Sequence, residues 1–339
     1  MYTLGVLSVT TTRSRWWVVG AGRAGTPLAR ALATSGHEVT LVVRRPEHAA
    51  TLLAPESAGE RAGGGGAAGP HEGTMPTVTL LDALLADPSA LMTAAAPAAT
   101  PVPLRPPTSA RVLLAVPDGV VGRLASRFAG QDVVLVHLSG AMGVEAVRAA
   151  GHVGAAAAVH PLRTFPSPDE PPSALVGTLF GVTTSEDEVA AQAAAELVAA
   201  AGGRAVELDE AQRPAWHLAA TLASNGVFAL LQAASQVLGG SGVDASAVGP
   251  SLATLAASSA ANVGTLGIVD AATGPVVRGD ERTIAAHAAA LADAAPEVRA
   301  LWSAVTMSLV QVGEQRGARA RSLAAIRAIV AGLDGDGRG

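Results

Sequence analysis

The segment GAGRAG at residues 20–25 constrains the fold more than any other stretch of the chain. It follows a short apolar run at residues 16–19 and precedes residues 26–35, which predict a helix that ends at Gly36. In a strand–GxGxxG–helix unit, the first glycine permits a tight turn, the second lets backbone approach a pyrophosphate, and the third lets the helix pack closely against the strand. Because a second strand is predicted at residues 38–43, the whole unit predicts dinucleotide binding.

The end of the second predicted strand indicates which dinucleotide binds. NAD-selective sites place an acidic residue there, whereas this chain has Arg44 and Arg45, whose guanidinium groups attract a 2′-phosphate. Two solvated arginines at a strand end remain the alternative interpretation. We predict NADPH or NADP as the cofactor. The predicted cofactor-binding residues are Gly20, Gly22, Arg23, Ala24, Gly25, Arg44, Arg45, Val116, Pro117, Asp118 and Ser139.

Further apolar runs extend this unit into an α/β fold. Short predicted strands recur with helical or turn segments between most of them, which is typical of a doubly wound, mostly parallel Rossmann sheet. After the last predicted strand the pattern is helical, so an all-α C-terminal domain is expected. The strands are predicted at 78–81, 111–116, 133–138, 155–159, 179–183 and 204–208, and the helices at 210–238, 245–263, 280–292, 296–315 and 318–332.

The length of 339 residues and the 49% hydrophobic content fit two domains. We predict an extension at 1–13, an NADP-binding domain at 14–208, and a helical domain for substrate binding and dimerisation at 209–332. Two low-complexity stretches near 60–73 and 93–108 are too poor in large apolar groups to pack, and they predict surface insertions in the first domain.

Composition excludes several kinds of chemistry. All 23 basic residues are arginine, so no lysine base or Schiff base is available, and the absence of cysteine removes thiol nucleophiles and disulfides. A net charge of −5 gives no reason to expect a nucleic-acid partner. We expect no metal site. No apolar run reaches the ~18 residues of a membrane span and no signal peptide is recognisable, so a cytoplasmic protein without a membrane partner is expected.

Two groups of polar residues are candidates for the reaction site. His160, in AVHPLRTFP, follows an apolar run where the carboxyl ends of parallel strands should form a crevice. On the predicted helix 210–238, His217, Thr221, Ser224 and Asn225 are spaced to share one face. An internal hydrogen-bond network or a solvated face is the alternative for this stripe.

A second polar cluster of the helical half is TGPVVRGD, residues 273–280. Gly274 and Pro275 predict a turn, and Asp280 is the expected N-cap of the next helix. Arg278 is left in a glycine-flanked loop, where its fork-shaped cation suits a substrate carboxylate.

Taken together, the motifs resemble a known family. VVGAGRAGTPLARAL, LLAVPDGVV, VHLSGAMG, VHPLRTFP, AWHLAATLASNG and ATGPVVRGD look like the Rossmann-type oxidoreductases whose C-terminal domain is labelled only as a domain of unknown function. These proteins are distant relatives of deazaflavin-dependent NADP reductases, pyrroline-carboxylate reductases and 6-phosphogluconate dehydrogenase. The resemblance runs from Arg15 to about Gly317, apart from the two low-complexity stretches.

The resemblance implies a substrate. Some members of the family are linked to ketopantoate reduction, so NADPH-dependent reduction of 2-dehydropantoate is the first expectation. Ketopantoate reductases of the better-known type use a lysine at the reacting carbonyl, and this chain has none. Another group must therefore supply the proton.

The predicted mechanism is hydride transfer from NADPH to the keto carbon of a small 2-oxo acid. His217 is the expected proton donor, with His160 a close rival. Asn225 is the third predicted catalytic residue. The residues predicted to bind the substrate are Thr221, Ser224 and Arg278. A reductase of imines or deazaflavins, and an NADP-binding regulator without activity, are the alternatives. By analogy with relatives, a homodimer through the helical domain is expected.

Overall fold

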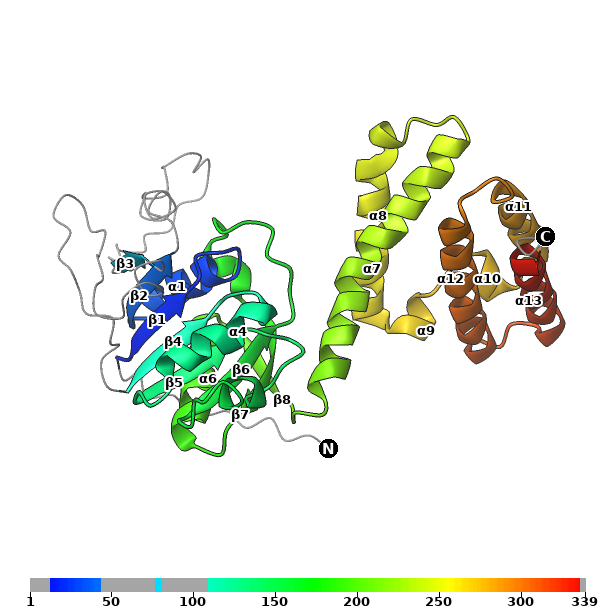
Figure 1. Cartoon of the computed structure of the whole chain (residues 1–339). Helices are drawn as coiled ribbons and strands as arrows, with labels where there is room; N and C mark the ends of the chain where they lie inside the picture. Colours follow the sequence, from blue (N-terminus) through cyan, green and yellow to red (C-terminus); the bar gives the residue numbers. More distant parts are fainter. Residues whose placement is uncertain (1–12, 44–76, 81–108, 336–339) are drawn as a thin grey trace. The chain divides into compact units, whose positions relative to one another are not determined.

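The computed structural model describes residues 13–43, 77–80 and 109–335, and it divides into two compact units, Met1–Ala220 and Thr221–Gly339 (Figure 1). Each unit is described by itself. Arg44, Arg45 and both predicted insertions lie outside the described residues, as do residues 1–12 of the predicted extension.

The first unit is built on one eight-stranded sheet with the order β3-β2-β1-β4-β5-β6-β7-β8. Strands β1 to β6 are parallel, β7 is antiparallel to β6, and β8 is parallel to β7. The predicted mostly parallel sheet is therefore confirmed. The strands are β1 (Arg15–Val19), β2 (Glu38–Val43), β3 (Thr77–Leu80), β4 (Ala110–Leu114), β5 (Val133–His137), β6 (Ala156–Pro161), β7 (Leu179–Thr184) and β8 (Arg204–Glu207).

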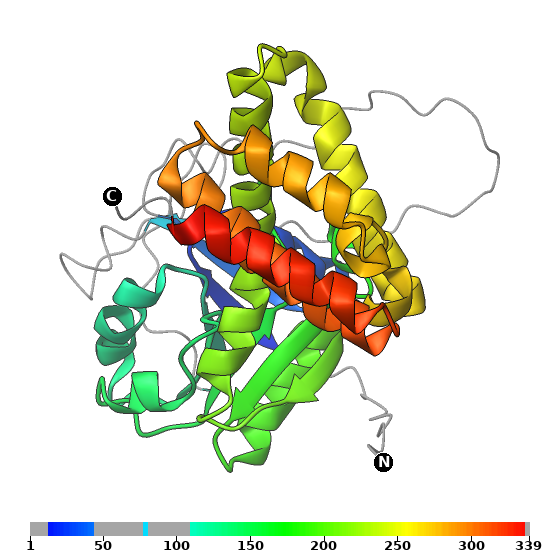
Figure 2. The same ribbon diagram turned by 90° about the vertical axis from the view of Figure 1, so that its right-hand side faces the viewer.

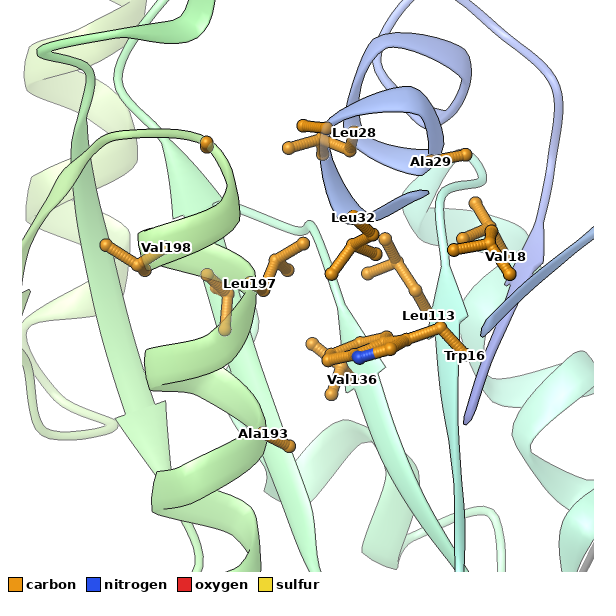
Figure 3. Close-up of a cluster of buried hydrophobic side chains, with 14 of the residues drawn as sticks. Trp16, Val18, Leu28, Ala29, Leu32, Leu113, Val136, Ala193, Leu197 and Val198 are labelled. Carbon is orange, nitrogen blue, oxygen red and sulfur yellow. The ribbon is translucent and has the colours of Figure 1, made fainter. Parts of the chain in front are cut away.

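Alternating strand residues form a core on each face of this sheet. Trp16 and Val18 of β1 belong to one cluster, with α1 and α6, and Trp17 and Val19 belong to the other, with α4. Figure 3 shows the indole of Trp16 among aliphatic side chains of the first cluster. Because helices cover both faces, the strands read as continuous apolar runs. The helical segments of this unit are α1 (Gly25–Thr34), α4 (Asp118–Ala125), η1 (Ser126–Phe128), α5 (Glu145–Arg148), η2 (Pro172–Leu175) and α6 (Glu188–Ala200).

Strand β6 extends further than predicted. His160 and Pro161 were expected just beyond the strand, but both pair with β7, His160 opposite Gly181 and Pro161 opposite Phe180. The proline is tolerated because β5 pairs only with residues 156–158, so the last part of β6 is an edge on that side. His160 is thus held by a sheet ladder rather than by a loop.

The second unit is helical, as predicted. A small core of Val276, Ile284, Val310, Leu323 and Ile326 joins α10, α11, α12 and α13. Figure 2 shows the last helix, α13 (red), and α12 and α13 make the most extensive contacts of this unit. The helices are α7 (Arg213–Gly240), which begins in the first unit, α8 (Ala245–Leu266), α9 (Ile268–Ala271), α10 (Pro275–Arg278), α11 (Glu281–Ala290), α12 (Pro296–Gln315) and α13 (Ala320–Gly335).

The TGPVVRGD segment differs in part from its prediction. Residues expected to form a loop make the one-turn helix α10, so Arg278 is the last residue of a helix, and Gly279 follows in the left-handed region at φ 70°. The predicted N-cap is confirmed, because Asp280 accepts hydrogen bonds from the Thr283 amide at 3.1 Å and the Thr283 hydroxyl at 2.7 Å.

By length and composition alone, helix α7 is apolar enough to cross a membrane. His217, Thr221, Ser224 and Asn225 interrupt its apolar surface. The expected absence of a membrane partner stays a prediction.

Candidate active site

The GxGxxG loop joins β1 to α1 with the geometry that its glycines predict. A Cβ on Gly20 would lie 2.3 Å from the Ala115 carbonyl oxygen, and Gly20 has φ 113°, a conformation open to glycine. A Cβ on Gly25 would lie 1.9 Å from the Gly20 carbonyl oxygen and 2.9 Å from the Ala115 Cβ. A Cβ on Gly22 would meet nothing within 4 Å. The first and third glycines therefore serve packing, whereas the second leaves the backbone open to a ligand.

The N-terminus of α1 is available to an anion. Its N-cap residue, Ala24, makes no side-chain cap, and no acidic residue stands in the first turn. Gly22 and Arg23 are exposed just before it. Free amides and the positive end of the helix dipole make such a terminus suitable for a pyrophosphate. These residues fit a dinucleotide.

The loops after β4 and β5 complete this edge of the sheet. The Ser139 hydroxyl donates to Asp118 Oδ2 at 2.9 Å and accepts from the Met142 amide at 3.1 Å. Pro117 is the N-cap of α4, and Asp118 is its first residue. Val116 packs beneath the GxGxxG loop, with its Cγ1 3.2 Å from the position that a Gly20 Cβ would take. The described cofactor-binding candidates thus lie at the carboxyl ends of neighbouring strands β1, β4 and β5.

His137, at the end of β5, fixes the Ser139 loop from below. It is fully buried; its Nδ1 accepts from the Ser139 amide at 3.3 Å, and its Nε2 donates to the Gly143 carbonyl at 2.9 Å. Burial lowers the pKa of His137 to about 4, so the ring is neutral at pH 7. It orders the loop and takes no part in proton transfer.

Arg213, the first residue of α7, is a buried cation beneath the site. Its guanidinium donates to Thr183 Oγ1 at 3.1 Å, to the Ala158 carbonyl at 3.4 Å and to the Ser139 carbonyl. Burial lowers its pKa to about 10, so it stays charged at neutral pH. Arg213 therefore ties β6, β7 and the loop after β5 to the start of α7.

Trp216 orients His160. The indole Nε1 donates to His160 Nδ1 at 2.9 Å, and the rings meet edge to face with centroids 6.5 Å apart. This packing needs Gly181, opposite His160 in the ladder, because a Cβ there would lie 2.7 Å from the indole. Since Nδ1 accepts, the neutral His160 ring carries its proton on Nε2.

His160 and His217 converge on Gly140. A Cβ on Gly140 would lie 2.4 Å from His217 Nδ1 and 2.9 Å from His160 Nε2. The two imidazole rings are perpendicular, with centroids 5.6 Å apart. In the described part of the chain, His217 Nδ1 is buried without a hydrogen-bond partner. Two imidazoles therefore pack against Gly140 at the carboxyl edge of the sheet.

The electrostatics of His160 disfavour a charged ring. Burial, followed by the charges of His217 and Arg213, lowers the pKa of His160 to about 4. His160 is therefore a neutral hydrogen-bond donor at pH 7 and a poor source of a proton.

The remaining predicted site residues belong to the second unit. Thr221, Ser224 and Asn225 continue along α7 from His217, and the Ser224 hydroxyl donates to Asn225 Oδ1 at 3.2 Å. Arg278 lies at the end of α10, beside Arg316 and Arg319. The structure thus brings together His160, His217 and Ser139 within the first unit, whereas Thr221, Ser224, Asn225 and Arg278 belong to the second unit.

Sequence reasoning missed the residues that support the two histidines. They are His137, Gly140 as a packing site, Gly181, Arg213 and Trp216. Arg213 and Trp216 had no usable signal, because Trp216, at i−1, does not share a helix face with His217, and the i−4 position of Arg213 does not report its burial against the sheet. Gly181 had none, because its role depends on the pairing of β6 with β7.

Comparisons with known proteins report the same fold. The family model "Domain of unknown function (DUF2520)" matches residues 178–309, and a search of curated proteins gives no match. The solved structure of "putative NADP oxidoreductase BF3122" from Bacteroides fragilis is 20% identical, with a TM-score of 0.58, over 88% of this chain and 98% of that chain. Protein TM1727 from Thermotoga maritima is 19% identical, with a TM-score of 0.58, over 89% and 99%. At these identities the likeness shows the fold: a Rossmann-type, mostly parallel sheet followed by helices.

Proposed function

We propose that the chain is an NADPH-dependent oxidoreductase that reduces the carbonyl of a small 2-oxo acid. The observation that carries this proposal is the convergence of His160 and His217 on Gly140, at the sheet edge that also bears the GxGxxG loop. The similarity of fold to a protein described as an NADP oxidoreductase supports it. In parallel α/β sheets, ligands bind outside the carboxyl ends of the strands, where these residues lie.

The cofactor would be held by the first unit. Gly22 leaves backbone accessible, and the uncapped N-terminus of α1 suits the pyrophosphate. Arg44 and Arg45, which follow β2, would select the 2′-phosphate of NADP over a ribose hydroxyl. When bound, NADPH supplies the hydride.

The chain's own residues would manage the proton. As the carbonyl carbon gains the hydride, its oxygen becomes an alkoxide that needs a proton and a donor aimed at it. His217 would donate that proton, and His160 Nε2–H, oriented by Trp216, would donate a hydrogen bond to the same oxygen. This division would place two imidazoles where ketopantoate reductases of the better-known type use a lysine.

The substrate is proposed to be a 2-oxo acid, with 2-dehydropantoate first. Thr221, Ser224 and Asn225, on the helix that carries His217, would contact its polar groups.

We expect NADPH absorbance to fall when the purified chain is mixed with NADPH and ketopantoate, and to fall more slowly with NADH. The panel also includes pyruvate, pyrroline-carboxylate and an oxidised deazaflavin. Turnover only with pyrroline-carboxylate or the deazaflavin would overturn the 2-oxo acid in favour of an imine or deazaflavin reductase. Tight NADPH binding with no turnover on the whole panel would indicate a regulator instead.

We also propose that a second copy of the chain covers the apolar surface of α7 and α8. No residue of α8 is buried within a single chain, and large apolar side chains of this surface are exposed. The many small residues of α8 allow close helix approach. The exposed side chains are Leu222, Phe228, Leu230, Leu255, Val263 and Leu266.

The mass in solution tests this pairing. Light scattering is expected to give twice the chain mass of 33.5 kDa, and Leu255→Glu is expected to shift the protein toward a monomer, because a charge would be buried at the interface. Val153→Glu, at a position 83% exposed in the first unit, is the matched control and should stay dimeric. A monomeric wild-type protein would contradict the proposal.

A further inference from the structure

The helical unit contains a cavity of about 610 Å³ that is lined by three arginines and by no carboxylate among the described residues. Arg278 comes from the end of α10, Arg316 follows α12, and Arg319 immediately precedes α13. These helices lie side by side in Figure 1. Such a volume falls in the range of small-molecule sites, roughly 300–1,000 Å³.

Arg316 is held firmly in place. Its Nη1 donates to three backbone carbonyls, those of Ala272 at 2.7 Å, Val269 at 3.2 Å and Asp270 at 3.3 Å. These bonds fix the guanidinium beside the cavity without neutralising its charge. A cation fixed in advance loses less conformational entropy when it binds an anion.

The charge of the arginines is not balanced within the described part of the chain. None of Arg278, Arg316 and Arg319 has a carboxylate within ion-pair distance, whereas Arg327, also in this unit, pairs with Glu314 at 2.6 Å. The nearby Asp280 carboxylate accepts two hydrogen bonds from Thr283; its charge interacts with that of Arg278, but the two groups form no ion pair. Three like charges are therefore gathered around one hollow.

The backbone around the cavity favours an anion as well. Helix α13, of 16 residues, begins at the cavity, and Ser322 in its first turn contributes to the lining. The positive end of its dipole adds to the arginine charges. Gly279, at φ 70°, brings α10 close to α13, because a Cβ there would lie 3.0 Å from the Ser322 Cβ.

We propose that this cavity binds an anion that carries at least two adjacent oxyanion groups, such as a diphosphate or a polycarboxylate. Guanidinium forks bind phosphate and carboxylate alike through paired, charge-assisted hydrogen bonds. A single carboxylate, the ligand predicted for Arg278 from the sequence, would leave two of the three cations unpaired. The proposal concerns the helical unit alone, and it holds whether or not the chain reduces a carbonyl.

Titration calorimetry of the full chain with inorganic pyrophosphate tests the site, at constant ionic strength and with saturating NADP so that the GxGxxG loop is already occupied. We expect Arg278→Ala and Arg319→Ala each to weaken pyrophosphate binding by about 10-fold or more, because each removes charge-assisted hydrogen bonds. Arg321→Ala is the matched control, since Arg321 is an exposed residue of α13 outside the cavity lining. Arg278→Lys keeps the charge but loses the fork, and it should weaken binding by less than Arg278→Ala.

Titrations with other anions identify the class of ligand, and the alanine variants can overturn the proposal. Acetate should bind far more weakly than pyrophosphate. Citrate binding as tight as that of pyrophosphate would indicate a polycarboxylate, and preference for pyrophosphate would indicate a phosphorylated ligand. Unchanged pyrophosphate affinity in both alanine variants, with native circular dichroism, would show that the anion binds elsewhere and would overturn the site. Because these readouts are binding constants, they do not depend on reductase turnover.

Discussion

Replacement of His217 by alanine is expected to lower kcat for the reduced substrate by about 10²–10⁴-fold, the usual contribution of a positioned general acid. The affinity for NADPH should stay unchanged, because His217 belongs to α7 and not to the GxGxxG loop or α1. The physical reason lies in the site itself. His217 Nδ1 is buried against Gly140, and the other imidazole there, His160, has a pKa of about 4 and cannot replace it as an acid at pH 7.

Steady-state kinetics with a matched control variant check this result. His287→Ala removes an exposed imidazole from α11 in the second unit and should leave kcat unaltered. His160→Ala is expected to raise KM and lower kcat by a smaller factor, because it removes an orienting hydrogen bond rather than the proton. A larger loss of kcat in His160→Ala than in His217→Ala would assign the proton to His160. A His217→Ala enzyme with wild-type kcat would show that His217 does not donate the proton.

The sequence predicted the parts of the fold that depend on local pattern. Short apolar runs interrupted by turns predicted all the described strands to within two residues at each boundary, because parallel strands are buried on both faces. The GxGxxG spacing predicted the turn at Gly20 and the close packing at Gly25, because a Cβ at either position would clash with neighbouring backbone. Local sequence therefore specified the sheet and the cofactor loop.

The support of the candidate site could not be predicted in this way. The Trp216–His160 hydrogen bond requires β7 to run antiparallel to β6, so that Gly181 faces the indole. Arg213 looks like an ordinary charged residue at a helix start, yet it is fully buried because three strand ends converge on it. These arrangements join residues far apart in the chain, and no periodicity reports them.

The same limit applies to a buried ion pair on the opposite side of the first unit. Arg111 of β4 contacts Glu196 of α6, with Nε 2.7 Å from Oε2 and Nη2 donating to Oε1 at 2.8 Å. The side chains of Ser14 and Gln192 each donate to the same Oε1 at 3.1 Å. Glu196 therefore joins α6 to the sheet and to the residue before β1, although its sequence context is that of a surface helix.

Glu196→Ala is expected to lower the free energy of unfolding of the first unit by about 3–5 kcal/mol, because it leaves the Arg111 guanidinium buried without its partner. Urea denaturation followed by tryptophan fluorescence measures this in a Trp302→Phe background, since the other three tryptophans, Trp16, Trp17 and Trp216, all belong to that unit. Glu38→Ala is the matched control: it breaks the Arg15–Glu38 pair, which is more than half exposed, and should cost within about 1 kcal/mol.

The double variant Arg111→Met, Glu196→Leu separates two contributions to the free energy of unfolding: the destabilisation by an unpaired buried charge and the stabilisation by the ion pair itself. Replacing both partners by apolar groups of similar size removes the buried charge, so most of the lost stability should return. If the double variant were instead as unstable as Glu196→Ala, the pair itself, with its hydrogen bonds from Ser14 and Gln192, would hold α6 against the sheet. A Glu196→Ala protein as stable as Glu38→Ala would show that water reaches Arg111 and that the pair is not a buried one.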